Sequence, residues 1–458
     1  MTSTIVLARI LSPDDYGIIA MVLAIMGFAG LFRELGLSSA AIQNQNLTPE
    51  LQNNLFWLNL LIGLALSLIT YLSAPLVALF YAKPELTIVT QILSITFVVG
   101  SLSTQHSADL TKNLKFGKRA AATIGGSLAT LICSICLALN DYGYWALVWS
   151  NILGTATASI LLIAFSRIPI SIPSRESGVR GAIGFGINVT SADLVNYFHR
   201  NLDNILIGKV WGATSLGFYS RAYSLLLFPV HAIRTPVNSV AFPIFSKLQQ
   251  HPQDLRGAFL KVVLCLGCLT MPITAFLFGN SGLIIELVLG SQWLKSAEIF
   301  SFLAIAAFTQ PVTGMLGSLL LSLGKTRTLL KCSTINAISL SLCFLAGLPW
   351  GATGVAAAYA IGNYLILYPW LKQAFEDTPV SLRQFTSACL PPALSSLIAL
   401  GAMLLANSER VLSNSIAIIS INLLTFGTVF FIILSFHRTG REAIKEAVGI
   451  ISNSLRLK

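Results

Sequence analysis

The chain has 458 residues, of which 55% are hydrophobic and only 10% are charged, and its mean hydropathy is +0.76. Soluble domains carry about 25% charged residues, so this composition excludes an ordinary soluble protein and indicates a polytopic membrane protein. The formal net charge is +11. The basic residues are concentrated in alternate loops and in the C-terminal tail, which reflects membrane topology and argues against a nucleic-acid partner.

Apolar runs long enough to cross a bilayer follow one another along the whole chain. A helical span needs about 20 such residues. The runs do not alternate with a period of two, so we expect an all-α polytopic fold rather than a membrane barrel. In chain order they predict a helical piece at 1–11 and then thirteen spans at 15–42, 51–81, 87–110, 119–139, 143–165, 184–208, 215–246, 257–279, 297–323, 328–348, 353–375, 384–406 and 412–436.

The loops between these spans alternate between basic and nearly uncharged. Lysine and arginine gather on the cytoplasmic side of membrane proteins, so we place the basic loops and the C-terminus in the cytoplasm. The connections on the opposite side carry few basic residues, among them Lys83, Lys209 and Arg410. The basic connections and the tail carry Lys112, Lys115, Lys118, Arg119, Arg167, Arg175, Arg180, Lys247, Arg256, Lys261, Lys325, Arg327, Lys331, Lys372, Arg383, Arg438, Arg441, Lys445, Arg456 and Lys458.

The second half of the chain repeats the first. Shifting the sequence by 200 residues aligns Leu7–Gly17 with Ile207–Gly217, and one further residue of slip aligns Arg33 with Arg234. An even number of spans separates the halves, so both have the same orientation, as in transporters built from parallel repeats. The predicted organisation is an N-lobe at 1–166, a cytoplasmic linker at 167–183, a C-lobe at 184–378, two C-terminal helices at 379–437 and a cytoplasmic amphipathic tail at 438–458.

The repeat also predicts a longer first helix than the one present. The counterpart of the span at 184–208 would end near residue 8, yet the sequence starts at residue 1. Eleven helical residues rise only ~16 Å, about half of the hydrocarbon core. We therefore expect roughly 15–20 residues of helix 1 to be missing, through a wrongly assigned start or a truncated gene product.

A polar stripe runs along the predicted span at 184–208. Asp193, Asn196, Arg200 and Asp203 recur at spacings of three, four and three, which places them on one face of a helix, and Asn204 adjoins them. One charge in hydrocarbon costs roughly 2.5–3.5 kcal/mol even on the lenient insertion scale. A stripe of this kind therefore favours a water-filled cavity inside a bundle, as in a transporter.

Several motifs carry a resemblance to a known family. They are Leu7–Gly17 (LARILSPDDYG), Phe28–Gln43 (FAGLFRELGLSSAAIQ), Phe56–Asn59 (FWLN), Asn201–Gly208 (NLDNILIG), Leu216–Tyr223 (LGFYSRAY), Pro243–Ser246 (PIFS) and Gly347–Gly351 (GLPWG).

These motifs follow one another in order over nearly the whole chain. Through them the chain resembles bacterial polysaccharide and O-antigen repeat-unit flippases of the colanic-acid exporter type. These belong to the multidrug/oligosaccharidyl-lipid/polysaccharide exporter superfamily. The resemblance implies a fourteen-helix plan, with two six-helix lobes and two further C-terminal helices, of which helix 1 is truncated here. It also implies the export of lipopolysaccharide or exopolysaccharide repeat units across the inner membrane, on a polyprenyl diphosphate carrier, from the cytoplasmic to the periplasmic leaflet.

The implied substrate suggests roles for the charged residues within the spans. Arginine suits a diphosphate because its fork meets phosphate oxygens bidentately. Arg200, near mid-membrane, is the first candidate; its alternative is a structural pair with Asp193 or Asp203. Those two carboxylates would orient Arg200 or bind a coupling proton or sodium ion, and no other cofactor or metal is expected. Arg33 and Arg234 would capture the diphosphate near the cytoplasmic mouth. Their alternative is snorkelling to the interface or, for Arg33, neutralisation near Glu34. With Asn196 and Asn204, these arginines form the predicted substrate site.

Three rival interpretations stay open from the sequence. The first is a cation-coupled multidrug antiporter of the same superfamily, which the clustered arginines disfavour. The second is a membrane enzyme such as a repeat-unit polymerase, which needs a sizeable extracytoplasmic loop that the chain does not provide, so no enzymatic activity is expected. The third is a non-functional truncated fragment. The expected partners are the lipid-linked oligosaccharide, membrane lipids and a polysaccharide polymerase complex.

Overall fold

The computed structural model describes residues 2–43, 48–166, 168, 170–174, 179–376, 378–408, 415–437 and 440–441. These residues form helices joined by short turns, with no strand among them. The predicted all-α polytopic fold is therefore confirmed for the described part of the chain. The predicted amphipathic tail at 438–458 lies outside the described residues except for 440 and 441.

The chain divides into two compact units, Met1–Gly217 and Phe218–Lys458. One helix, α9 (Val179–Lys247), runs from the first unit into the second. It is broken at Gly212, whose φ of 80° and ψ of −178° are open to glycine and strained for other residues. The break falls between the predicted spans at 184–208 and 215–246. The first part of α9 belongs to unit 1, so the lobe boundary placed in the linker at 167–183 stays a prediction.

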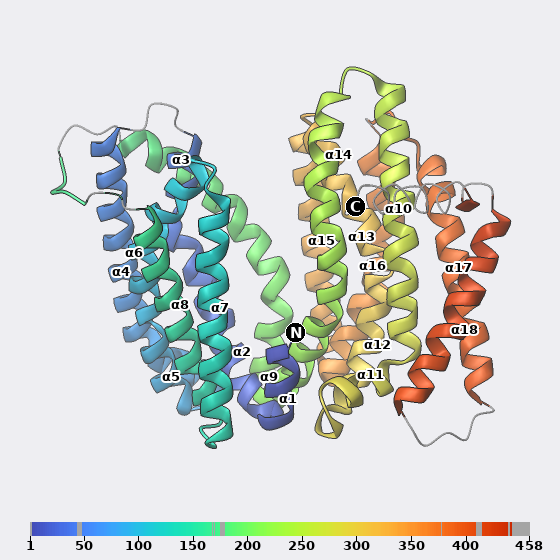
Figure 1. The fold of residues 1–458 in the computed structure, drawn as a ribbon, viewed down its shortest axis with the longest axis horizontal. Coiled ribbons are helices and arrows are strands. Elements are labelled where there is room, and N and C mark those ends of the chain that lie inside the picture. Colours follow the sequence, from blue (N-terminus) through green and yellow to red (C-terminus); the bar gives the residue numbers. More distant parts are fainter. Residues whose placement is uncertain are drawn as a thin grey trace, which may run out of the picture. The chain divides into compact units, whose positions relative to one another are not determined.

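Unit 1 is a bundle in which α4, α6, α7 and α8 run side by side (Figure 1). Small residues allow α7 and α8 to approach closely: a Cβ added at Gly154 would lie 1.8 Å from Oγ1 of Thr130. The helices of this unit before α9 are α1 (Thr2–Ile10), α2 (Pro13–Glu34), α3 (Leu37–Gln43), α4 (Pro49–Tyr81), α5 (Glu85–Leu93), α6 (Ile95–Lys112), α7 (Phe116–Leu139) and α8 (Trp145–Ser166).

The predicted span at 15–42 needs a correction. Helix α2 ends at Glu34 because Leu35 and Gly36 take positive φ values of 37° and 60°, and α3 is a separate short helix. Gly36 allows such a turn at little cost, whereas a leucine in this conformation is uncommon. Hydropathy alone continues across the turn and therefore did not reveal it.

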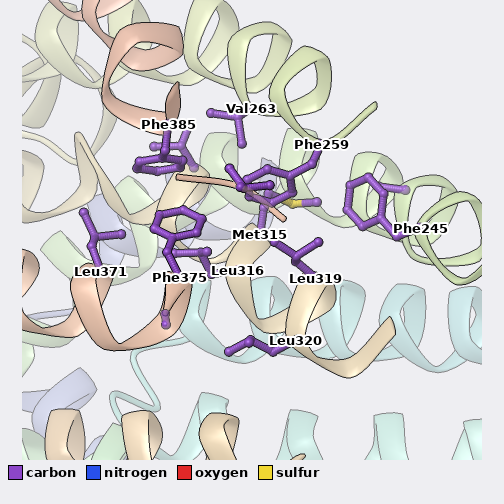
Figure 2. Packing of buried hydrophobic residues seen from close by; sticks show 14 of the residues in the cluster. Phe245, Phe259, Val263, Met315, Leu316, Leu319, Leu320, Leu371, Phe375 and Phe385 are labelled. Atoms are coloured by element: carbon purple, nitrogen blue, oxygen red, sulfur yellow. The ribbon is translucent and has the colours of Figure 1, made fainter. Parts of the chain in front are cut away.

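Unit 2 packs around a core to which α9, α10, α14, α16 and α17 contribute (Figure 2). The rings of Phe259, Phe375 and Phe385 meet there with centroids 5.3–6.4 Å apart. The elements of this unit after α9 are α10 (Pro252–Gly279), α11 (Ser281–Val288), η1 (Ser291–Trp293), α12 (Lys295–Ala307), α13 (Gln310–Thr313), α14 (Met315–Ser322), α15 (Thr326–Gly347), η2 (Leu348–Trp350), α16 (Gly351–Phe375), α17 (Leu382–Ser408) and α18 (Ser415–Phe436).

The last two helices are joined to the rest of unit 2 by packing and by a buried polar contact. Helix α17 packs on α10 and α18. The side-chain amide of Asn422 on α18 donates to Oδ1 of Asn280, between α10 and α11, at 2.6 Å, and both residues are almost fully buried. A satisfied polar pair inside apolar packing fixes the register of the helices it joins.

Helix length and composition identify ten candidate membrane spans among the described residues, or eleven if the bent pair Lys295–Ala307 and Gln310–Ser322 is one span. Two of the ten, Arg200–Lys247 and Thr326–Phe375, are 48 and 50 residues long. Thr326–Phe375 is long enough for two crossings, because a crossing takes about 20 residues, and it covers the predicted spans at 328–348 and 353–375. Arg200–Lys247 covers the predicted span at 215–246 and only residues 200–208 of that at 184–208. The bent pair corresponds to the predicted span at 297–323.

Candidate substrate site

Arg33 lies in the last turn of α2, whose start is fixed by a capping box between Ser12 and Asp15. Its side chain is half-buried and lies against Gly100 of α6. A Cβ added at Gly100 would come within 2.5 Å of Nη1 and 3.3 Å of Cζ of Arg33. The guanidinium thus occupies space that only a glycine leaves open.

Arg234 makes the same kind of contact in unit 2. It lies on α9, is half-buried, and directs Nη2 toward the carbonyl oxygen of Gly314 at 3.5 Å. A Cβ added at Gly314 would lie 2.4 Å from Nη2. Gly314 stands between α13 and α14, on the bent pair of helices. One turn further along both helices, Ser318 donates its hydroxyl hydrogen to Oδ1 of Asn238.

Both glycines are separated in sequence from the basic residues that follow them. Gly100 precedes Lys112, the end of α6, by twelve residues, which is about 18 Å of helix. Gly314 precedes Ser322, the end of α14, by eight residues, which is about 12 Å of helix. The predicted position of both arginines near the cytoplasmic mouth, and its alternative of snorkelling to the interface, stay predictions.

The polar stripe is only partly described. Asp203 is buried, with 4% of its surface exposed, and its Oδ1 accepts the backbone N–H of Asn204 at 2.8 Å. Oδ1 of Asn204 is buried and has no hydrogen-bond partner in the described part of the chain. Arg200 is exposed. The side chains of Asp193 and Asn196 lie outside the described residues, so their predicted roles stay predictions.

Tyr197 joins the stripe to α2, and the sequence reasoning missed it. Its hydroxyl donates to the backbone carbonyl of Ala24, and a Cβ at Gly27 would lie 2.5 Å from that hydroxyl oxygen. Its ring lies 6.3 Å from that of Phe28. The signal was a tyrosine within a polar stripe, four residues after Asp193 and three before Arg200. Tyr197 brings the stripe beside the helix that carries Arg33.

A reciprocal glycine contact joins the two repeated segments within unit 1. A Cβ at Gly17 would lie 1.8 Å from the carbonyl oxygen of Ala213, and a Cβ at Gly217 would lie 1.9 Å from that of Pro13. Each glycine therefore packs on the residue four positions before the other. This is the pairing expected if the 200-residue repeat is also a structural repeat. We call Pro13–Gly17 against Ala213–Gly217 the glycine contact.

Asp14 adds polar bonds beside the glycine contact. Its Oδ1 accepts the hydroxyl hydrogen of Thr214 at 2.9 Å, and Nζ of Lys83 lies 3.1 Å from both carboxylate oxygens. Thr214 follows Asp14 by 200 residues, so this bond also joins two positions that the 200-residue repeat aligns. The cluster is at the end of α2 opposite Arg33.

At the other end of α4, two asparagines bind the segment that follows α8. Asn53 accepts the N–H of Ser171 at 2.9 Å and donates to the carbonyl of Ile172 at 3.2 Å. Asn54 binds both the N–H and the carbonyl of Ser174, at 2.9 and 2.7 Å. The indole of Trp57 donates to Ser171 at 2.8 Å. The start of the predicted linker is thus held by side-chain amides.

The structure brings Arg33, Tyr197 and the stripe into unit 1, and it places Arg234 in unit 2. Among the described residues, no three or more His, Cys, Asp or Glu side chains are arranged to hold a metal ion. The chemistry that the described site offers is therefore cationic and hydrogen-bonding: half-buried guanidinium groups, one buried carboxylate and amide side chains.

These features define a polytopic helical membrane protein with charged groups inside its bundles, and a solved structure has the same fold. The lipid II flippase MurJ in an inward closed conformation superposes with a TM-score of 0.79 over 95% of both chains, at 17% sequence identity.

A family model described as polysaccharide biosynthesis protein matches residues 6–298. The chain belongs to this family, and the family resemblance stated from the sequence is confirmed. The teichuronic acid biosynthesis protein TuaB of Bacillus subtilis is 31% identical over 302 residues, 65% of this chain and 62% of the relative. The lipopolysaccharide biosynthesis protein WzxC of Escherichia coli is 25% identical over 367 residues, 78% of this chain and 73% of the relative. The match thus spans less than two thirds of the TuaB chain.

Proposed function

We propose that this protein moves a polyprenyl-diphosphate-linked oligosaccharide from the cytoplasmic to the periplasmic leaflet of the bacterial inner membrane. Its family, relatives named for polysaccharide biosynthesis, and a fold shared with a lipid II flippase support the proposal. The observation that carries it is the pair Arg33 and Arg234, one in each unit, each half-buried on a glycine.

The chemistry of a diphosphate explains why arginine is needed. Its oxygens take up two parallel N–H···O bonds from one guanidinium, and these bonds are roughly twice as strong as neutral ones. A half-buried position strengthens the attraction, because the local dielectric is lower than in bulk water. Each unit therefore offers one arginine with the chemistry to bind a diphosphate. Arg200 is the third cation of this site.

The transport cycle in this proposal is alternating access between the two repeats. The glycine contact, reinforced by the bond from Thr214 to Asp14, closes the periplasmic end between α2 and α9. It must open for the oligosaccharide to leave. The released repeat unit would then be available to a polymerase on the periplasmic face, and the basic C-terminal tail would lie on the anionic cytoplasmic surface.

Asp203 supports a second candidate, a cation-coupled antiporter. A buried carboxylate in a membrane bundle is the kind of group that binds a proton or a sodium ion. The same residue fits the flippase if that ion drives the cycle, with Asp193 as its partner. The two functions differ in cargo: the flippase requires Arg33 and Arg234, whereas export of a cationic drug gains nothing from them.

Complementation of a bacterial strain that lacks its own repeat-unit flippase tests the proposal. Loss of one charge-assisted hydrogen bond is worth about 1.5–3 kcal/mol, so Arg33→Ala or Arg234→Ala should lower transport by about 10- to 150-fold. The matched control is Arg327→Ala, which removes an exposed positive charge at the start of α15. It should retain transport.

The direction is measured in spheroplasts, as the fraction of lipid-linked repeat that an added, membrane-impermeant glycosidase can cleave. The wild-type chain should raise this fraction, and the two arginine variants should not. The flippase proposal fails if both alanine variants transport like the wild type, or if the wild type exports cationic drugs while lipid-linked repeats stay inaccessible.

A further inference from the structure

We infer that Gly100 and Gly314 are positioning residues for the substrate site: each sets where the guanidinium of Arg33 or Arg234 lies. The inference rests on the proposed function, because it assumes that these arginines bind the diphosphate. It goes beyond that function by assigning a role to two residues that carry no charge and no side chain.

The first argument is that the same arrangement occurs twice, on separate elements. In unit 1, Arg33 of α2 lies on Gly100 of α6; in unit 2, Arg234 of α9 lies on Gly314 between α13 and α14. The sequence repeat pairs the two arginines. The predicted spans at 87–110 and 297–323 correspond in order, because each is the second span after the one that carries the arginine. A chance close contact has no reason to recur at equivalent helices in two units of different sequence.

The second argument is that hydrogen bonds to a neighbouring helix fix the backbone at or beside each glycine. The carbonyl of Gly100 accepts hydrogen bonds from Ser103 and Thr104 at 3.0 and 3.1 Å, and Ser103 is bonded to Ser159 of α8 at 3.0 Å. Ser159 in turn donates to the carbonyl of Val99 at 3.0 Å. The backbone that faces Arg33 is therefore fixed to a second helix.

In unit 2, the turn before Gly314 is fixed in a similar way. The N–H of Gly314 donates to the carbonyl of Gln310 at 2.9 Å. The side-chain amide of Gln310 donates to the hydroxyl of Tyr359 on α16 at 2.6 Å and lies 3.5 Å from Oδ1 of Asn363. Both glycines thus form rigid surfaces on which a flexible arginine rests.

The third argument concerns what an added methyl group would do. A Cβ would lie 2.5 Å from Nη1 of Arg33 or 2.4 Å from Nη2 of Arg234, whereas nonbonded heavy atoms rest at about 3.5 Å. The atom in the way is the end of a flexible side chain, so the guanidinium would move by roughly 1 Å while the helices stay in place. Displacement of a binding group by that amount can lower a rate by about 100-fold.

The test compares Gly100→Ala and Gly314→Ala with Gly401→Ala, a helical glycine on α17 at which an added Cβ meets no atom within 4 Å. Transport is measured by the glycosidase assay, and folding by the thermal unfolding midpoint of the purified protein. Alanine favours helix more than glycine does, so no variant should lose thermal stability. Gly100→Ala and Gly314→Ala should lower transport by about 10- to 100-fold, and Gly401→Ala should leave it unchanged.

A double-mutant cycle separates positioning from a merely structural role. Gly100→Ala should lower transport in the wild-type background but have little further effect on the residual transport of Arg33→Lys, because the glycine acts through the arginine fork. Equal effects in both backgrounds, or a lowered unfolding midpoint in Gly100→Ala, would overturn the inference. The inference would also be overturned if Gly100→Ala transports like the wild type while Arg33→Ala is inactive. In that case the proposed function would still stand. Wild-type transport by both arginine→Ala variants would refute the proposed function itself.

Discussion

The glycine contact and the two arginine–glycine contacts use the same residue type for opposite mechanical purposes. At Gly17 and Gly217 the neighbouring atom is a backbone carbonyl oxygen, fixed within a helix. At Gly100 and Gly314 the neighbouring atom is the end of an arginine side chain, which can move. The first arrangement sets how closely two helices approach, and the second sets where a charge lies. A methyl group should therefore damage stability in the first case and transport in the second.

The largest effect on folding is expected for Gly17→Ala and Gly217→Ala. The added Cβ would force the helices apart, and such overpacking destabilises by about 1–3 kcal/mol. The higher helix propensity of alanine offsets only up to about 1 kcal/mol of this loss of stability. We expect a lowered thermal unfolding midpoint for both variants, with Gly100→Ala measured beside them. Equal midpoints for Gly17→Ala and Gly100→Ala would remove the distinction between the two kinds of contact.

A smaller effect is expected at Thr214, which bonds to Asp14 beside the glycine contact. Thr214→Val keeps the shape but loses the hydroxyl, and one hydrogen bond contributes about 0.5–1.5 kcal/mol. Thr214→Ser keeps the hydroxyl and is the matched control. Thermal unfolding should rank valine below serine and wild type. If valine matches serine, then close backbone packing alone holds these segments together.

The smallest effect is expected for Lys83→Gln. The Lys83 and Asp14 side chains are 28% and 43% exposed, and an exposed ion pair contributes about 0–1 kcal/mol. The unfolding midpoint should fall slightly at low salt, and the difference from the wild type should shrink as salt is raised. A large loss that salt does not reduce would mean that this ion pair, rather than glycine packing, holds α2 in place.

Much of the fold could be predicted because the bilayer sets the length of every span. Each predicted span has a helical counterpart, and the break at Gly212 falls in the gap between two of them. The end of α2 was missed because Leu35 carries no sign of its positive φ. The lobe boundary in the linker at 167–183, which followed from the internal repeat, stays a prediction.

The candidate site was less predictable. The internal repeat paired Arg33 with Arg234, and the structure places each of them against a glycine. Gly100 and Gly314 had no distinguishing signal, since glycines are frequent in membrane helices and these lie 67 and 80 residues from their arginines. The polar stripe gave a signal at Tyr197 but did not reveal its partner, which is a backbone carbonyl on another helix. Contacts between helices that are distant in sequence depend on how each helix is rotated about its axis and on the angle at which the helices cross. Neither can be read from a single sequence.

The amides of Asn53 and Asn54 bear on how this protein can vary. Their shorter bonds go to main-chain groups of Ser171, Ile172 and Ser174, and Nδ2 of Asn54 also lies 3.5 Å from the side-chain Oγ of Ser174, so most of the binding is independent of side-chain identity. Pro173 falls at the position whose nitrogen is not used as a donor. Substitutions here should therefore be tolerated, provided the two donors remain. An insertion of one residue would shift every bond out of phase. The length of this segment is therefore constrained more strongly than its amino-acid identities. We expect related proteins to keep its length while its residues vary.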